Sequence, residues 1–365
     1  MDVTKSVEAE AEEVEGLGDE TVDVWGDYPI DTVLIRTETR TVYDVMRRIE
    51  KGSFIMNPDF QRDFIWPDDK QSKLIESVLM RIPLPVFYLA EDGQGRTIVV
   101  DGLQRLSTFQ RFCKNELRLK LPNQPDLDKR HFRDFSPKLQ NRVEDCNLVL
   151  YVIDAKIPER ARLDIFERVN GGIPLTRQQM RNCLYMGRAT AFLKDQAATD
   201  LFREATGYSL KSSTMRDREF VNRFCAFQLL SLEEYRGDMD ECLAKALTKM
   251  NALSDAELDR LAAEFRTALA NNSKLFGKHA FRKHQPGQVD RSVLNASLWD
   301  VMSTGLSRIR EEVLEGRAGA LRQAFYALLS DPQFNNSITY SPNSTAQVLH
   351  RFQAARKMFQ EVFDA

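Results

Sequence analysis

The stretch TIVVDGLQRLSTFQRF, residues 97–112, changes from the periodicity of a strand to that of a helix within two residues. Residues 97–100 form a short apolar run that is typical of a buried strand. The apolar residues that follow recur at the three- and four-residue spacing of an amphipathic helix: Leu103, Leu106, Phe109 and Phe112. Only Asp101 and Gly102 separate the two elements, so the stretch predicts a strand–helix unit at the centre of a mixed α/β fold.

The junction at Asp101 and Gly102 also has the features of an anion-binding site. The start of a helix leaves backbone N–H groups without intrahelical partners, and the helix dipole favours negative charge there. A glycine lets a phosphate approach the backbone, and Arg105 can make a bidentate charged contact. Because the apolar residues occupy the buried face, we expect Gln104, Arg105 and Thr108 to face solvent or a ligand.

A structural interpretation of the same junction stays open. Asp101 is a good N-cap residue, and Gly102 can serve only to relieve a tight turn. A capping carboxylate would also repel a phosphate unless a cation lies between them. The sequence contains neither a GxxxxGK[ST] loop nor a GxGxxG loop, so the common nucleotide-binding folds are not indicated.

A polar cluster at residues 57–62, Asn-Pro-Asp-Phe-Gln-Arg, follows a predicted strand and ends close to Trp66. Functional residues concentrate on loops that a rigid scaffold holds in place. We therefore expect Gln61 and Arg62 to point into the same cleft as Arg105. The alternative makes Arg62 a surface ion-pair partner and Trp66 a core anchor.

A third cluster at residues 168–172, Arg-Val-Asn-Gly-Gly, follows a predicted helix. The functional interpretation has Asn170, Gly171 and Gly172 close a ligand site, and the alternative is an ordinary loop after a helix. Farther along, His279 and His284 are expected to be basic surface residues, because no partners stand at metal-ligand spacing.

Length and composition set the class of the protein. The 365 residues, of which 42% are hydrophobic and 29% charged, are typical of a soluble globular chain of two or three domains. No apolar run reaches the roughly 18 residues that span a bilayer, so no membrane partner is expected. Five scattered cysteines without a CxxC pair favour reduced thiols and a cytoplasmic protein.

Charge is distributed unevenly along the chain. Residues 1–27 hold ten acids and one lysine, a net charge of −9, so the chain's total of −3 leaves +6 for the rest. This composition predicts an acidic disordered tail over residues 1–29. A second interpretation makes the tail a nucleic-acid mimic that masks a basic groove.

The remaining chain divides by pattern. Strand and helix patterns alternate to about residue 185, and amphipathic helices follow almost to the end. We therefore predict an α+β protein with a mixed α/β domain over residues 30–185 and an α-helical domain over residues 186–365.

Four segments, in this order, carry a resemblance to one family: NPDFQRDFIWP, PLPVFYL, VVDGLQRLST and IFERVNGGIPLTRQQMRNCLY. They resemble the domain-of-unknown-function 262 family, the N-terminal module of GmrSD-type modification-dependent restriction systems. Later segments resemble its helical continuation. The resemblance implies a ParB/sulfiredoxin-like fold with a nucleotide-binding cleft, in a phage-defence protein that hydrolyses NTP with Mg²⁺.

The family's Asp-Gly-Gln-Gln-Arg signature maps onto residues 101–105, where Leu103 replaces the first glutamine, so a contact made by that amide is absent. The resemblance implies catalytic roles for Asp101, Gln104 and Arg105, with Asp101 as the Mg²⁺ ligand. It implies nucleotide contacts from a larger set: Gln61, Arg62, Gly102, Gln104, Arg105, Thr108, Asn170, Gly171 and Gly172.

Many family members carry an HNH nuclease domain, whose clustered histidines are absent from this sequence, so HNH cleavage by this chain is not expected. The partner that the resemblance implies is a separate nuclease or methyltransferase subunit. Two alternatives stay open: a non-catalytic DNA-binding sensor module, and a nuclease within the ParB-like half. A homo-oligomer is also compatible with the sequence.

Overall fold

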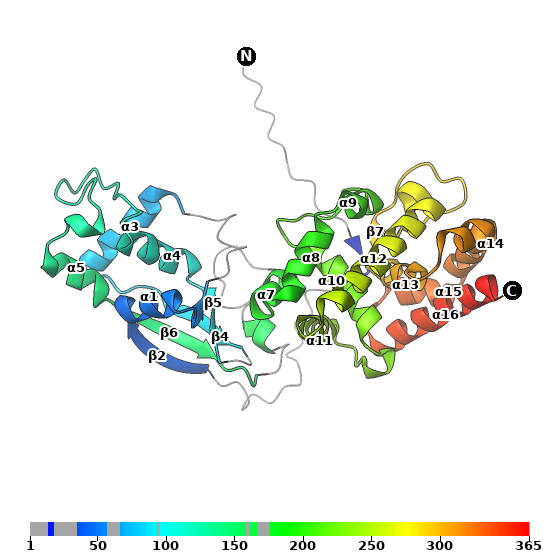
Figure 1. The fold of residues 1–365 in the computed structure, drawn as a ribbon, viewed down its shortest axis with the longest axis horizontal. Coiled ribbons are helices and arrows are strands. Elements are labelled where there is room, and N and C mark those ends of the chain that lie inside the picture. The colour runs from blue at the N-terminus through cyan, green and yellow to red at the C-terminus, as the bar shows by residue number, and fades with distance from the viewer. Residues whose placement is uncertain are drawn as a thin grey trace, which may run out of the picture. The chain divides into compact units, whose positions relative to one another are not determined.

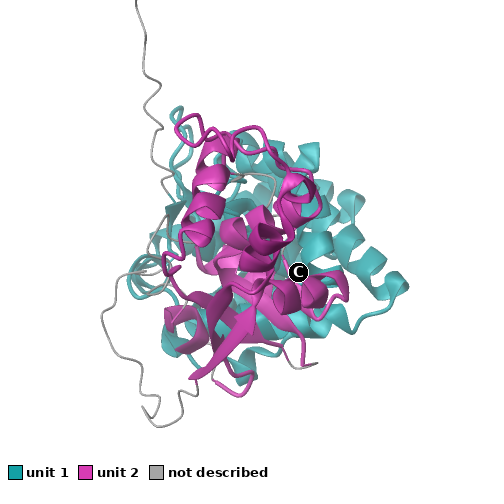
Figure 2. Cartoon of the chain, turned by 90° about the vertical axis from the view of Figure 1, so that its left-hand side faces the viewer, with its two compact units in different colours: residues 1–24, 185–365 teal, residues 25–184 magenta. Residues whose placement is uncertain are grey.

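The computed structural model describes residues 14–17, 35–56, 66–92, 95–157, 161–165 and 176–364. The chain forms two compact units, one of residues 25–184 and one that combines residues 1–24 with 185–365 (Figure 2). The first unit contains a sheet with helices and the second is almost wholly helical, which confirms the predicted α+β class. None of the described helices has the length and apolarity that a membrane crossing requires.

A five-stranded sheet forms the centre of the mixed unit (Figure 1). Its strands are β2 (Ile35–Thr41), β3 (Phe54–Ile55), β4 (Phe87–Glu91), β5 (Thr97–Asp101) and β6 (Asn147–Ile153). They lie in the order β2–β6–β4–β5–β3. The pairs β4–β6 and β3–β5 are parallel, and the pairs β2–β6 and β4–β5 are antiparallel. The consecutive strands β4 and β5 therefore form an antiparallel hairpin.

The helices of the mixed unit are α1 (Val42–Glu50), α3 (Asp68–Leu79), α4 (Leu103–Cys113), α5 (Pro137–Glu144) and α7 (Arg177–Leu184), with a 3-10 turn at Phe132–Asp134. Val99 of β5 and Phe109 of α4 belong to one buried core with α1 and α3. Ile98 and Val100, which alternate with Val99 along the strand, are also buried. Since α7 packs against β5, both faces of this strand are covered, which explains its unbroken apolar run.

The helical unit contains α8 (Arg188–Ala197), α9 (Asp200–Thr206), α10 (Arg216–Leu229), α11 (Met239–Asn251), α12 (Asp255–Phe276), α13 (Ala296–Leu306), α14 (Glu311–Ser330), α15 (Pro332–Thr339) and α16 (Thr345–Phe363), with 3-10 turns at Leu232–Glu234 and Gly277–His279. Trp299 of α13 has no exposed surface, and its indole N–H donates to the Phe220 carbonyl over 2.8 Å. The rings of Phe220 and Phe281 lie at centroid distances of 5.2 and 4.5 Å from it. Aromatic packing around this tryptophan therefore forms the centre of the core.

One carboxylate and two guanidinium groups are buried in the same unit. Asp300 of α13 accepts two hydrogen bonds from Arg223 of α10, at 2.8 and 2.7 Å, and one from Arg351 of α16, at 2.8 Å. All three side chains are 0% exposed, and Arg351 also donates to the Pro342 carbonyl. Because buried charges must be paired and hydrogen-bonded, this cluster fixes three helices relative to one another.

We predict that Asp300→Asn lowers the free energy of unfolding by about 3–5 kcal/mol, because it leaves two buried arginines without a counter-charge. Denaturant unfolding followed by circular dichroism measures the change. Asp259→Asn, at an exposed position of α12, is the matched control and should leave the unfolding midpoint within experimental error. A loss below about 1 kcal/mol for Asp300→Asn would contradict the assigned role.

The acidic N-terminal segment departs from the sequence-based expectation at residues 14–17. β1 (Val14–Glu15) pairs in parallel with β7 (Leu294–Asn295) of the helical unit. The expectation of a disordered tail over residues 1–29 is therefore wrong for these four residues, and the rest of that range lies outside the described residues. Two paired residues are too few to show a strand periodicity, so the pattern could not predict them.

His284 also departs from expectation, because its side chain is buried and only 6% of the residue is exposed. Its ring stacks on His279 at 4.9 Å between centroids, and its Nδ1 lies 2.9 Å from the Arg282 carbonyl. Burial lowers the pKa of His284, and the neighbouring His279 lowers it further, while the Arg282 carbonyl opposes the shift. The interpretation of His284 as a basic surface residue is therefore wrong.

The lowered pKa of His284 predicts that the protein loses stability in acid. An unfolded histidine has a pKa of about 6.5, so below that value the unfolded chain binds the proton more readily than the folded one. The stability that neutral His284 contributes to the folded state is fully present above about pH 6.5, and it is lost as the pH falls through the pKa of the folded state. The midpoint temperature of thermal unfolding should therefore fall as the pH is lowered from 8 to 5. His284→Phe should flatten this dependence, whereas His131→Gln, in the other unit, should retain it.

Candidate functional site

The candidate site begins where β5 passes into α4. Gly102 is the N-cap of α4 with a left-handed backbone (φ 98°), and it has no side chain to accept from the first turn. The carboxylate of Asp101 does not cap the helix but accepts a hydrogen bond from Arg105 Nη2 at 2.7 Å. The structural interpretation of Asp101 as the N-cap is therefore wrong. The first-turn N–H groups of α4 consequently lack a side-chain cap in the described structure.

Gly102 is required by packing as well as by its backbone angle. A Cβ atom at this position would lie 2.3 Å from Cδ1 and 2.9 Å from Cε1 of Phe87. Phe87 is fully buried at the start of β4, so its ring cannot give way without opening the core. Packing against Phe87 therefore requires a glycine at position 102, whether or not a phosphate binds there.

We predict that Gly102→Ala lowers the free energy of unfolding by about 2 kcal/mol or more, because backbone strain and crowding add. Gly95→Ala is the matched control: Gly95 also has a positive φ (75°), but a Cβ there would meet nothing within 4 Å. It should show only the strain, about 1 kcal/mol. Equal losses for the two variants in denaturant unfolding would contradict the contact with Phe87.

Arg105 lies inside the unit and is only 8% exposed. Besides Asp101, its guanidinium donates to the carbonyls of Pro85 and Val86, and its Cζ lies 4.2 Å from the centroid of the Phe87 ring. Burial lowers the pKa of Arg105, and Asp101 opposes the shift. The guanidinium thus supplies donors to two carbonyls that precede β4, and it neutralises the carboxylate beside the helix start.

Thr108 is also buried, at 1% exposure, and its hydroxyl donates to the Gln104 carbonyl over 2.7 Å. The expectation that Arg105 and Thr108 face solvent or a ligand is therefore wrong for both. An apolar stripe shows which side of a helix is most buried, but it does not exclude burial of the flanks. Here the segment before β4 covers the side of α4 that carries Arg105.

Gln104 connects the first polar cluster to this junction. Its Oε1 accepts a hydrogen bond from the Trp66 N–H at 2.9 Å, and the Trp66 carbonyl accepts one from Gln71 of α3. Trp66, which follows Gln61 and Arg62 in the sequence, therefore lies beside the start of α4. Gln61 and Arg62 themselves lie outside the described residues, and so do Asn170, Gly171 and Gly172.

Helix α7 carries polar residues that the sequence pattern did not single out as a candidate site. Gln178 and Asn182 are 0% and 1% exposed, four residues apart on one helix face. Among the described residues, Gln178 Nε2 and Asn182 Oδ1 have no hydrogen-bond partner although they are buried, an uncommon state that calls for an explanation. The signal in the sequence was a polar helix, RQQMRN, without an apolar stripe. Because α7 packs against β5, these amides belong to the unit that holds the junction.

The residues at the junction fit a metal ion only if a bound ligand, such as a nucleotide, supplies further oxygen ligands. The described residues contain no group of three His, Cys, Asp or Glu side chains that could hold a metal. One carboxylate oxygen of Asp101 is bound to Arg105, which leaves the other as a single protein ligand. Mg²⁺ commonly binds through one or two carboxylates and the phosphates of a substrate. Asp101 alone is compatible with that mode but not with a metal site built by protein side chains.

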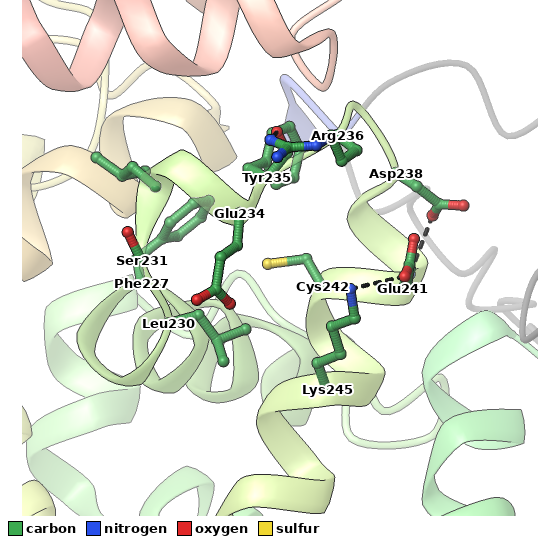
Figure 3. Close-up of a pocket in the computed structure, with 11 residues that line it drawn as sticks. Phe227, Leu230, Ser231, Glu234, Tyr235, Arg236, Asp238, Glu241, Cys242 and Lys245 are labelled. Carbon is green, nitrogen blue, oxygen red and sulfur yellow. Dashed lines mark hydrogen bonds and ion pairs between the residues drawn. The ribbon is translucent and has the colours of Figure 1, made fainter.

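Each unit has a hollow lined by described residues. Figure 3 shows one in the helical unit, with Glu234, Cys242 and Lys245 around it; its volume of about 20 Å³ suits a single water molecule. A groove of about 510 Å³ lies in the mixed unit, where Arg81, Lys138 and Arg142 are among the lining residues. Of the predicted site residues that the structure describes, none is among the residues lining either hollow.

Comparison with known proteins concerns the mixed half of the chain. Residues 42–186 match the family described as GmrSD restriction endonuclease, N-terminal domain. The match runs from α1 to the end of α7 and confirms the resemblance inferred from the motifs. It associates this part of the chain with restriction systems. Among the curated proteins, none matches the chain.

Proposed function

We propose that the mixed unit binds a nucleoside triphosphate at the junction of β5 and α4, and that the protein serves a restriction system directed against phage. One observation carries the proposal: the 2.9 Å hydrogen bond from the Trp66 N–H to Gln104 Oε1. It holds Trp66, which follows Arg62 by four residues in the sequence, at a helix start without a side-chain cap. Free helix N–H groups and an arginine are the donors that bind phosphate in proteins.

Each residue at the junction has a role in this proposal. The N–H groups at the start of α4 bind a phosphate, and Arg62 neutralises its charge. Gln104 holds the Arg62 segment in place, and Asn170 with the two following glycines closes the site. Arg105 is a positioning residue, because its contacts with Asp101 and with the carbonyls before β4 fix the junction.

Hydrolysis is the second part of the proposal. Asp101, held by Arg105 at 2.7 Å, orients a water molecule towards the terminal phosphate through its free carboxylate oxygen. Mg²⁺ bound with the phosphates would neutralise the charge that develops there. Leu103 stands where the family has a glutamine, and it offers no hydrogen bond to water or phosphate, so we propose a slow reaction. DNA cleavage is assigned to a separate nuclease subunit.

Calorimetry with ATP, GTP and CTP, each with Mg²⁺, tests the binding site. We predict that Gln104→Ala weakens the binding of the preferred nucleotide by about tenfold, because the Trp66 N–H loses its acceptor. Gln110→Ala, on the third turn of the same helix, is the matched control and should bind as the wild type does. Arg105→Ala is unsuitable as a probe, since the buried guanidinium supports the fold.

Two results would overturn the proposal. One is the absence of binding for all three nucleotides at millimolar concentration with a folded protein. The other is DNA binding that needs no nucleotide and weakens steeply with salt, as expected when phosphate contacts release counterions; it would favour the non-catalytic sensor module. Phosphate release by the wild type that Asp101→Asn abolishes at unchanged nucleotide affinity would support hydrolysis at this site.

A further inference from the structure

Residues 14–17, Val-Glu-Gly-Leu, lie on the helical unit in contacts that come from distant parts of the chain. Glu15 Oε1 accepts a hydrogen bond from Lys283 Nζ at 2.5 Å, across 268 positions of sequence. The Leu17 carbonyl accepts one from Asn343 Nδ2 at 2.6 Å. Together with the pairing of β1 and β7, these bonds hold backbone and side chain of the segment at both of its ends.

The site also selects for glycine at its centre. Gly16 has a φ of 81°, and a Cβ atom there would lie 3.3 Å from Ser297 Oγ and 3.4 Å from both Asn295 Oδ1 and the Ile338 carbonyl. These atoms surround the position, and Asn295 and Ser297 are fully buried. Any other residue would therefore meet both an unfavourable backbone and close contacts. On either side of Glu15 and Gly16, Val14 and Leu17 pack against the core of the helical unit.

The walls of this site are held by bonds that do not involve the segment. Asn295 donates from Nδ2 to the Ile338 carbonyl at 3.0 Å and accepts from the Leu298 N–H at 2.8 Å. The Asn343 carbonyl accepts from the Tyr235 hydroxyl at 2.6 Å. Lys283 is also anchored, by a 2.6 Å bond to Thr339 Oγ1. A site whose parts are fixed in advance loses little entropy when a peptide binds.

We propose that the helical unit carries a docking site for a short peptide with the pattern apolar–acidic–glycine–apolar, and that the chain's own residues 14–17 occupy it. The recognition rests on strand pairing with β7, on the charge complementarity of Glu15 and Lys283, and on the left-handed backbone and close contacts at position 16, which favour glycine. Strand addition to an exposed edge is a general mode of peptide binding, in which the backbone gives affinity and the side chains give specificity.

Docking has a topological consequence for the mixed unit. The chain enters residues 18–184 from a point fixed on the helical unit at Leu17, and it returns to that unit at Tyr185. In sequence, the mixed unit of residues 25–184 therefore lies between two parts of the helical unit, and the docked segment belongs to the first of them. This function is independent of nucleotide binding at β5 and α4.

A variant of the chain that lacks residues 1–17 tests the site directly. The probe is a fluorescein-labelled peptide of residues 10–20, EAEEVEGLGDE, followed by fluorescence anisotropy. We expect saturable binding to this variant and at least about tenfold weaker binding to the full chain, in which the site is filled. A peptide with Glu15→Lys or with Gly16→Val should bind the variant at least about tenfold more weakly. Binding no better than that of a scrambled peptide would overturn the proposal.

Hydrogen exchange on the full chain gives a second test that does not depend on the truncation. Exchange at residues 14–17 should be slow in the wild type, fast in Glu15→Lys, and slow again when Glu15→Lys is combined with Lys283→Glu. Unchanged exchange in Glu15→Lys, or no rescue by the double variant, would contradict the recognition by charge. Protection that rises with protein concentration would assign the occupant to a second copy and overturn the intramolecular contact.

Discussion

A single carboxylate shared by two fully buried arginines constrains the helical unit. Asp300 binds Arg223 and Arg351 from two other helices, and none of the three charges can reach water. Such a cluster permits little variation in helix position, since any shift leaves a charge unpaired in a medium of low dielectric constant. The constraint extends beyond the helices, because Arg351 also binds the Pro342 carbonyl. The next residue, Asn343, holds the backbone of the N-terminal segment.

The mixed unit uses an arginine and an aspartate in a related way at its candidate site. Arg105 joins Asp101 to two carbonyls that precede β4, while Gly102 makes room for the ring of Phe87. The residues of the family signature therefore support the fold at the place where they are proposed to bind a ligand. A loss of activity on substituting them cannot by itself be assigned to chemistry. Gln104 is the better probe, because its side-chain oxygen accepts a hydrogen bond from the Trp66 N–H.

Periodicity in the sequence was sufficient to predict helices and strands, but it was insufficient to predict which other elements cover them. The apolar run of β5 and the stripe of α4 follow from local pattern, and the structure confirms both. The burial of Arg105 and Thr108 depends on what covers α4, which no local pattern contains. His284 is buried for the same reason, among rings from other helices. The burial of the polar helix α7 against β5 likewise could not be predicted from its local pattern.

The pairing of β1 with β7 sets an order for events during synthesis. The ribosome makes residues 14–17 first, but their partner strand at Leu294–Asn295 emerges only after the whole mixed unit has been translated. Domains generally fold as units as they emerge, so the mixed unit can fold while the N-terminal segment still lacks its partner. The helical unit is then completed last, by a contact between the oldest and some of the newest parts of the chain. Formation of that contact therefore requires that translation has passed the mixed unit and has reached β7.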